Sequence, residues 1–319
     1  MLAAVLTVGV FASATPPLQA QPASPPGCPP VPQPPGTEQV EVAREAARDR
    51  GFLWRISKGG HSSYLYGTLH VGKLEWAPPG PTLRRALAEA EVLALELDVT
   101  DPATLRKLQD ALARQPSDPS VAPELRERLV QETQHACLPR GALDDQKLAA
   151  QALSLVVLAA RWEGLDAVYG QEFVLANHAR SRGMPIVALE TVDEQVAALL
   201  PGTAAEAGRF IQQALDQLRS GAARRASRRL AQAWAGGRLD ELAHYEQWCE
   251  CVAGGEDRQL LRRLNDDRNP AMASRIERLH NRGRPVFAGV GALHMTGPKA
   301  LPALLRQRGF RVERVEFAP

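Results

Sequence analysis

The chain lacks an excess of charge of either sign. Its 319 residues include 38 Lys and Arg against 36 Asp and Glu, which gives a formal net charge of +2 at pH 7. Proteins that bind nucleic acid concentrate basic residues on one face or in one segment. The basic run at 224–229, RRASRR, has apolar residues at helical spacing on either side. We interpret it as the solvated face of a helix and expect no nucleic-acid partner.

Long apolar runs are also missing. No segment reaches the roughly 18 uninterrupted apolar residues that suggest a membrane span. The apolar residues 1–20 end in small residues suited to cleavage after Ala14 or Ala20, which predicts a signal peptide, although this stretch contains no Lys or Arg. Residues 21–37 are rich in proline and are predicted to form a linker. We therefore expect a periplasmic or secreted protein with no stable membrane anchor after signal removal, of unknown oligomeric state.

Several widespread catalytic motifs are absent as well. No Gly-rich phosphate loop follows the first predicted strands, and neither G-x-S-x-G nor H-E-x-x-H occurs. Their absence argues against a nucleotide-binding phosphate loop, a serine hydrolase built on a nucleophile elbow, and a metalloprotease of the H-E-x-x-H type.

Cysteine is scarce, but the number is even. The four residues are Cys28, Cys137, Cys249 and Cys251, and an exported chain with this number favours disulfides. A bridge between Cys249 and Cys251 would close a very tight ring, so we expect each of them to pair with a distant cysteine. The alternative is a Cys-x-Cys metal clip, for which no second pair lies nearby in the sequence.

The pattern of apolar residues predicts an α/β fold, with α+β as the alternative. FLWRIS and SSYLYGTLHV are predicted to form two strands around a KGGH turn, and VLALELD, PIVALE and the segment after Arg284 are typical of strands buried on both faces. We expect a mixed, largely parallel sheet in one domain over residues 38–319, with helical insertions at about 102–180 and 204–280.

A short unit occurs twice. An apolar strand runs into Gly-x-x-His at Gly67 to His70 and again at Gly291 to His294, and each copy is followed by a loop with proline, a helix and another strand. Agreement in both motif and element order is far more specific than the four-residue motif alone. The two glycines fit a close approach of the backbone where the strand leaves the sheet.

Polar side chains stand at the ends of these strands. Glu96 lies near the end of VLALELD, Glu190 ends PIVALE, and His70 and His294 close the repeated units. In open α/β sheets the site lies at the carboxyl ends of the strands, so we expect these four side chains to converge. Glu190 has an alternative interpretation as a cap of the following helix. The remaining histidines of interest, His61 and His280, are expected at the surface.

The motifs resemble a known family. GTLHVG, LALELD, GLDAVYGQEF, PIVALETVDEQ, LNDDRNPAMASRIERL and the final VFAGVGALHMTGPKALPALLRQRGFRVERV are similar to the TraB/GumN (PrgY-like) family, over about residues 52–315. That family is related to the Tiki metalloproteases and, more distantly, to erythromycin-esterase-like (EreA) and haem-iron-binding ChaN-like proteins. The resemblance places an active site on His70, His294, Glu96 and, in DDRNP, Arg268.

The resemblance to Tiki proteins implies an exported hydrolase that depends on a divalent metal, manganese or cobalt, with zinc as a further option, and that cleaves a peptide or amide bond. His70, Glu96 and His294 would be the ligands and would leave an open position for water. Glu190 would serve as a base or would orient a histidine, and Arg268 would stabilise an oxyanion. Two alternatives remain: a metal-independent, esterase-like hydrolase of a small molecule, and a non-catalytic envelope protein that binds a peptide or an iron ligand.

Overall fold

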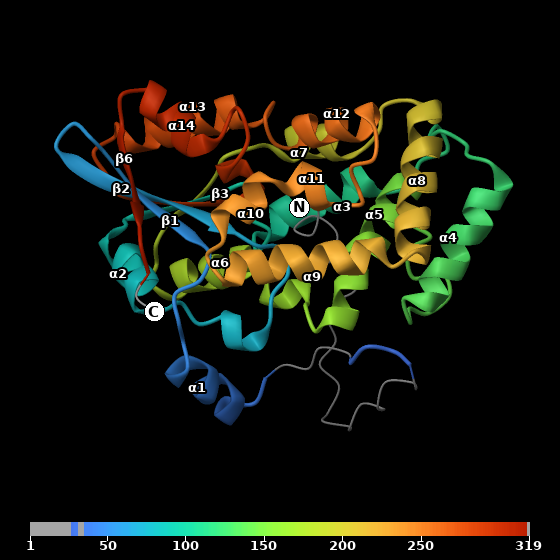
Figure 1. Ribbon diagram of the computed structural model, residues 1–319, viewed down its shortest axis with the longest axis horizontal. Helices are drawn as coiled ribbons and strands as arrows, with labels where there is room; N and C mark the ends of the chain where they lie inside the picture. Colours follow the sequence, from blue (N-terminus) through green and yellow to red (C-terminus); the bar gives the residue numbers. More distant parts are fainter. Residues whose placement is uncertain (1–26, 31–34, 318–319) are drawn as a thin grey trace.

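The computed structural model describes residues 27–30 and 35–317 (Figure 1). The predicted signal peptide and most of the predicted linker lie outside these residues. A six-stranded sheet occupies one side of the molecule, and a group of helices built from the middle of the chain occupies the other. No helix in the described part of the chain combines the length and apolarity needed to cross a membrane.

The sheet has the strand order β4-β3-β5-β2-β1-β6. β2, β5, β3 and β4 pair with one another in parallel, and β1 lies antiparallel to both β2 and β6. The expected mixed, largely parallel sheet is therefore confirmed. The strands are β1 (Phe52–Lys58), β2 (His61–Thr68), β3 (Val92–Leu95), β4 (Ile186–Ala188), β5 (Val286–Gly291) and β6 (Arg311–Val315).

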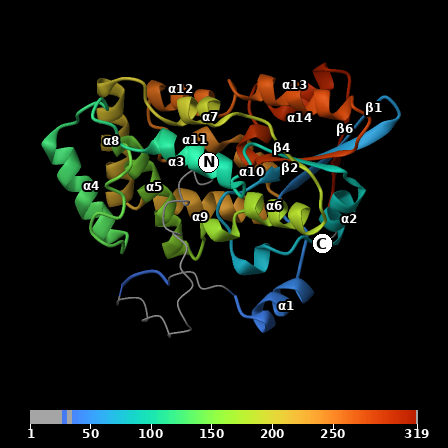
Figure 2. The same ribbon diagram turned by 180° about the vertical axis from the view of Figure 1, so that it is seen from behind.

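Local sequence explains the strands. β1 and β2 form a hairpin whose turn residues Gly59 and Gly60 both have positive φ, which glycine adopts without steric cost. β3 and β5 are buried along their whole length, as expected for central parallel strands that are covered on both faces. Figures 1 and 2 place α13 (Asn269–His280) and α14 (Leu301–Gln307) above the sheet and α6 (Gln171–Ser181) below it.

The repeated halves have the expected element order. After β2 come the 3-10 helix η2 (Leu74–Trp76), α2 (Pro81–Glu89) and β3, and after β5 come η5 (Ala292–Met295), α14 and β6. β2 and β5 are neighbours and pair in parallel, with Gly67 opposite Val290 and Thr68 opposite Gly291. Both Gly-x-x-His units therefore leave the sheet at the same edge and side by side.

The rest of the chain is helical and forms a second hydrophobic core beside the sheet core. In Figure 1, α9 runs from beside the sheet across the middle of the molecule, while α4 and α8 stand at the far end. The remaining elements are α1 (Thr37–Glu45), α3 (Pro102–Leu112), α4 (Pro123–His135), α5 (Leu148–Leu158), η3 (Ala159–Glu163), η4 (Ala167–Tyr169), α7 (Val192–Leu199), α8 (Ala204–Arg219), α9 (Ala222–Ala235), α10 (Leu239–Ala243), α11 (Tyr245–Trp248) and α12 (Gly255–Leu264).

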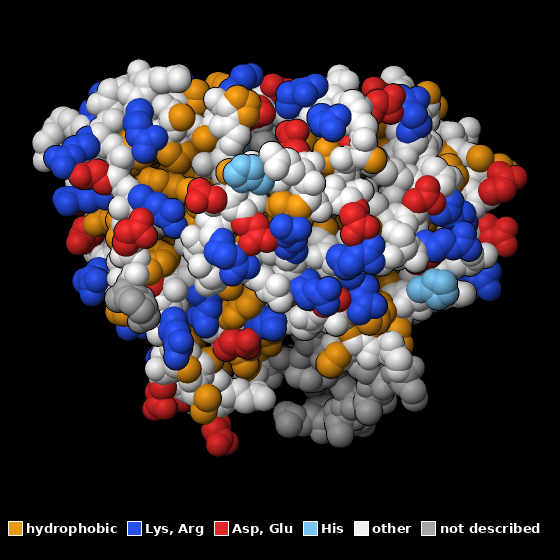
Figure 3. All heavy atoms as spheres, viewed as in Figure 1, with side chains coloured by type: hydrophobic (Ala, Val, Ile, Leu, Met, Phe, Trp, Pro, Cys, Tyr) orange, Lys and Arg blue, Asp and Glu red, His pale blue; other side chains and the backbone are white. Residues whose placement is uncertain are grey.

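The basic run of α9 is a solvated face. Its four arginines are exposed, while Leu230 and Ala223 are buried against the core. Arg225 pairs with Glu250 and Arg229 with Glu241, at 2.7 Å in each case. Figure 3 shows basic and acidic side chains interspersed over this side of the molecule, so the run does not produce a basic patch.

The cysteine pairing corrects one expectation. Cys28 and Cys137 are joined across 109 residues, as a disulfide between distant cysteines, but Cys249 is bonded to Cys251. A turn after α11, in which the Val252 amide donates to the Cys249 carbonyl at 3.0 Å, brings the two Cα atoms within 5.0 Å. That separation is normal for a disulfide. All four cysteines are described and none is free, so the Cys-x-Cys metal clip is also wrong in this structure.

His280 corrects a second expectation, because it is fully buried rather than at the surface. Its Nδ1 lies 2.8 Å from the Ser63 hydroxyl and its Nε2 lies 2.9 Å from the Lys58 carbonyl. The ring stacks on His61 with centroids 3.8 Å apart. His280 thus ties the end of α13 to the β1–β2 hairpin.

Peptide mapping of the protein, purified and digested without reductant, tests the pairing. We expect cross-linked fragments that join Cys28 to Cys137, and a separate fragment whose mass shows that Cys249 and Cys251 have together lost two hydrogen atoms. Replacing Cys28 and Cys137 with serine should lower the free energy of unfolding by about 2–5 kcal/mol, because the bridge closes a long loop in the unfolded chain. Fragments that link Cys249 or Cys251 to either other cysteine would contradict the structure.

The stability of the protein should fall on acidification partly through His280. Burial, the largest effect, lowers the pKa of His280 below its usual value of 6.5. The unfolded chain therefore binds this proton at a higher pH than the folded chain, so stability is lost as the pH falls below about 6.5. Urea unfolding at pH 7.5 and 5.5 should show a larger loss for the wild type than for His280→Gln. Equal losses in the two proteins would contradict this assignment.

Candidate functional site

The carboxyl ends of β2, β3, β4 and β5 lie at one edge of the sheet, and polar residues follow each of them. Glu96 comes directly after β3, and Glu190 comes two residues after β4. The Leu189 and Glu190 amides donate to the carbonyls of Leu95 and Glu96, at 2.7 and 3.1 Å, which keeps the ends of the two strands together. His70 follows β2 and His294 lies in η5, the short helix after β5.

Arg268, at the N-terminus of α13, lies among these residues. Its Nη2 is 2.5 Å from Glu96 Oε2 and also bonds Glu190 Oε2, while its Nε donates to Glu190 Oε1 at 2.9 Å. Nη1 donates to the Leu264 carbonyl at 2.9 Å. The arginine is only 9% exposed, and both carboxylates are buried. The guanidinium therefore binds Glu190 through two nitrogens and joins it to Glu96.

Burial and charge act in opposite directions on these three groups. Burial, the largest single effect, would raise the pKa of Glu96, but Arg268, the two histidines and the Gly291 amide together outweigh it, and the pKa is far below its usual value. For Glu190 burial prevails, and its pKa is raised despite the hydrogen bonds from Arg268. Burial would lower the pKa of Arg268, but Glu96 and Glu190 more than compensate and raise it. Arg268 is therefore a permanent cation, and Glu96 is ionised.

His294 is held in one tautomer. The Asn269 side chain donates through Nδ2 to the carbonyls of His294 and Lys299, so its Oδ1 is the acceptor for His294 Nδ1 at 2.6 Å. The unprotonated Nε2 then faces Arg268 Nη1 at 3.3 Å and Glu96 Oε2 at 4.0 Å. Burial lowers the pKa of His294 to about 3. The ring is therefore neutral at physiological pH and presents a lone pair to the cluster.

His70 has a carboxylate behind it. Its Nδ1 lies 2.9 Å from Glu172 Oε1, which also accepts a hydrogen bond from the Thr68 hydroxyl. The contact between His70 Nδ1 and Glu172 Oε1 is short enough for an ion pair, but its geometry is not that of a hydrogen bond. Burial, the largest single effect, lowers the pKa of His70, but the contact with Glu172 and the charge of Glu96 together reverse this, and the net pKa is raised. The two histidines thus differ in their readiness to take a proton.

Gly291 is the point where these groups meet. A Cβ atom at this position would lie 3.2 Å from Glu96 Oε1, 3.3 Å from His70 Nε2 and 3.6 Å from His294 Cδ2. The Gly291 amide also donates to Glu96 Oε1 at 2.8 Å. Glycine therefore leaves room for three functional groups at the end of β5. At Gly67, a Cβ atom would meet Ala292, Met295 and Phe52, each at 3.3 Å, so this glycine allows β2 and η5 to approach.

The nitrogen and oxygen atoms of the cluster are of the types that bind metal ions. In this structure, however, they are not arranged as a set of metal ligands. Both imidazoles have Nδ1 beside an oxygen acceptor, which is how metal-ligating histidines are usually supported. His70 turns Nε2 toward the Gly291 backbone, whereas His294 turns Cδ2 toward it and Nε2 toward Arg268. Two buried carboxyl groups face a single guanidinium and a third, Glu172, lies behind His70, an excess of negative charge that suits a cation. Within residues 27–30 and 35–317, however, no group of three or more His, Cys, Asp or Glu is arranged to hold a metal.

The structure brings together all five residues expected in the site, and it adds three others. Glu172, Asn269 and Gln195 are buried and contact His70, His294 and Glu96 respectively, with Gln195 Nε2 3.4 Å from Glu96 Oε2. Glu190 does not cap α7, since Thr191 accepts from the Glu194 amide in that role. Glu172 lies in GLDAVYGQEF and Asn269 follows Arg268 directly, so the motifs contained both residues but gave no sign of their roles.

Comparison with known proteins places this site in a family. A sequence profile of the TraB/PrgY/gumN family matches residues 52–314, which is most of the chain and includes every residue of the cluster. The chain belongs to this family. TraB/PrgY/gumN relatives include a protein of Shigella flexneri and one of Escherichia coli strain K12, both called "Uncharacterized protein YbaP".

These two relatives are 27% and 26% identical to the chain over 170 residues. The match covers 51% of the chain and 62% of each relative, so it spans less than two thirds of their length. No solved structure matches the chain.

Removal of the Arg268 charge should destabilise the protein. In Arg268→Met two buried carboxylates lose their partner, and breaking a buried ion pair in this way costs about 3–5 kcal/mol. The control is Arg284→Met, which breaks an exposed pair with Glu91 and should cost less than about 1 kcal/mol. Urea unfolding of the two variants measures the difference. Equal, small losses would show that Arg268 is not the main partner of these carboxylates.

Proposed function

We propose that this member of the TraB/PrgY/gumN family is a hydrolase that cleaves a peptide or amide bond at the cluster of His70, Glu96, Arg268 and His294, with the help of a divalent metal ion. The main support is the orientation of the two imidazoles. Each keeps Nδ1 beside an acceptor and presents the opposite edge of its ring to the space left by Gly291, His70 through Nε2 and His294 through Cδ2, and Glu96 Oε1 also lies there. Two nitrogen ligands and a carboxylate are a common donor set of catalytic metal sites.

His70, His294 and Glu96 would hold the ion, which is manganese or cobalt by resemblance, with zinc as a further option. When bound, the ion would polarise the scissile carbonyl and lower the pKa of water toward neutrality. The negative charge of the cluster supports this proposal, because buried carboxylates without enough positive charge are costly and a cation would relieve the imbalance.

The other side chains have separate tasks in this proposal. Glu172 and Asn269 fix the rings of His70 and His294 from behind. Arg268 keeps Glu96 ionised, and its positive charge would stabilise an oxyanion that develops beside it. Glu190, whose pKa is raised by burial, positions Arg268 through two hydrogen bonds and is the carboxyl group in this cluster that most readily exchanges a proton.

A second candidate is hydrolysis without a metal, with His70 as the general base. The pair of Glu172 and His70 supports it, because a carboxylate behind a histidine stabilises the imidazolium that forms when the ring takes a proton. The raised pKa of His70 also favours proton uptake by this ring. Arg268 would again stabilise the oxyanion through its positive charge.

We also propose that the protein acts in the periplasm or outside the cell. The disulfides support this location, since such bonds persist in oxidising compartments and are rare in the cytosol. The substrate would then be a peptide or small molecule of the cell envelope or the medium.

A peptide library assayed with manganese, with zinc and with chelator tests the proposal. We expect cleavage by the wild type, no cleavage by His70→Ala or His294→Ala, and a loss in Glu172→Gln of about 10- to 100-fold in metal affinity or activity. His135→Ala, at an exposed position, is the matched control and should behave as the wild type.

Metal content, measured independently of activity, separates the two candidates. After dialysis against manganese, the wild type should retain about one ion per chain, and His70→Ala and His294→Ala should retain none. Cleavage that survives chelation in a protein without metal would favour the second candidate. Peptide binding without any product from the library would instead leave the chain as a non-catalytic binding protein.

A further inference from the structure

A small apolar hollow lies beside His70. Its volume is about 140 Å³, and its lining combines the end of β2, the end of α5 and one side of α9. An apolar cavity of about 150 Å³ is large enough to hold a benzene ring. The residues that line the hollow include His70, Val157, Ala160, Ala223, Ser227 and Leu230.

The sequence of α9 explains the free space. Between its exposed arginines the helix carries Ala223, Ala226 and Ser227, whose short side chains face the hollow, while larger side chains such as Leu230 fill the core nearby. Because β2 delivers His70 to the same hollow, a group that occupies it lies against a residue of the proposed reaction centre.

A second apolar hollow, of about 100 Å³, adjoins the first. The two share Val156, Gln217, Tyr245 and Cys251 in their linings, so the segment closed by the Cys249–Cys251 disulfide forms a wall of both. The second hollow is also lined by Leu264, whose carbonyl binds Arg268. The two hollows together thus border the cluster on the His70 side and on the Arg268 side.

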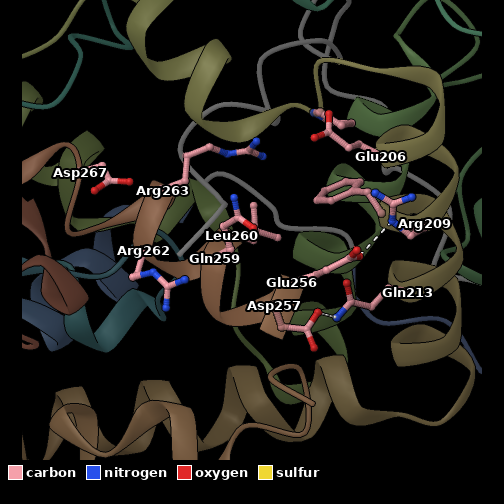
Figure 4. Close-up of a pocket in the computed structure, with 12 residues that line it drawn as sticks. Glu206, Arg209, Gln213, Glu256, Asp257, Gln259, Leu260, Arg262, Arg263 and Asp267 are labelled. Carbon is pink, nitrogen blue, oxygen red and sulfur yellow. Dashed lines mark hydrogen bonds and ion pairs between the residues drawn. The ribbon is translucent and has the colours of Figure 1, made fainter. Parts of the chain in front are cut away.

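A polar groove continues from the second hollow. It has a volume of about 430 Å³ and shares Phe210, Gln213, Asp257 and Leu260 with that hollow. Figure 4 shows charges of both signs along it: Arg209 reaches Glu256, Gln213 reaches Asp257, and Arg262 points into the groove. A groove lined by both charges suits a polar chain with mixed side chains.

We propose that the two hollows and the groove form one binding cleft for a peptide that places a leucine-sized aliphatic side chain beside His70. That the bound peptide is cleaved rests on the proposed function. That it binds in this cleft does not. The small size of the hollows favours single side chains, and the charges of both signs in the groove favour a peptide over the long apolar chain of a lipid.

Binding of two neutral peptides tests the cleft. The probes are N-acetyl-Ala-Leu-Ala-amide and N-acetyl-Ala-Ser-Ala-amide, titrated by calorimetry into Glu96→Gln protein, which should not cleave them. We expect the leucine peptide to bind about tenfold or more tightly, because its side chain leaves water. In the double variant with Ser227→Leu, which fills the hollow, this preference should disappear. Ser274→Leu on α13 is the matched control and should keep it.

Further controls separate filling of the hollow from loss of the Ser227 hydroxyl and from unfolding. Ser227→Ala keeps the hollow open and should retain the preference, and thermal unfolding shows whether Ser227→Leu is folded. Equal affinity of the two peptides for the Glu96→Gln protein, in which the hollow is unchanged, would overturn the proposal. So would tighter binding of decanoate that displaces the leucine peptide, since the occupant would then be an acyl chain. A preference for leucine without any hydrolysis by the wild type would contradict the proposed function and leave the cleft intact.

Discussion

The buried arginine between two buried glutamates is the interaction on which the rest of the site depends. Arg268 belongs to α13, whereas Glu96 and Glu190 belong to the ends of adjacent strands, so the ion pairs hold a helix over the edge of the sheet. The desolvation of three charges is offset only while all of them stay in place. This constraint keeps Glu96 ionised and turned toward the histidines, and it also limits how freely the cluster can rearrange.

The histidines have a similar dependence on what lies behind them. Asn269 is adjacent to Arg268 in the chain, so the helix end that supplies the cation also fixes the ring of His294. His70 depends on Glu172 of α6, on the other face of the sheet. One histidine is neutral by burial and the other is next to a carboxylate, and this difference explains why the same geometry supports either a metal ligand pair or a ligand beside a base.

Much of this arrangement could be predicted, because it follows from periodicity and topology. Apolar runs that end in Glu96, Glu190 and the two Gly-x-x-His units predict parallel strands, and parallel strands place those ends at one edge. Contacts made by distant segments could not be predicted in this way. Glu172 has the sequence signature of an ordinary acidic residue in the first turn of a helix, and His280 that of a residue at a helix end. The Cys249–Cys251 bridge depends on a turn that the sequence pattern does not predict.

The division of the molecule into a sheet part and a helical part has a functional consequence. The groups of the proposed reaction centre come mainly from strand ends and from the start of α13, whereas the walls of the proposed cleft come mainly from α5, α8, α9 and α12. Changes in helix side chains can therefore alter which group reaches His70 without disturbing the ion pairs that hold Glu96. If the proposed chemistry depends on the sheet edge and substrate selection on the surrounding helices, relatives with the same cluster need not share a substrate. The lining of the cleft, rather than the Gly-x-x-His motif, is then where differences in substrate within the family should be sought.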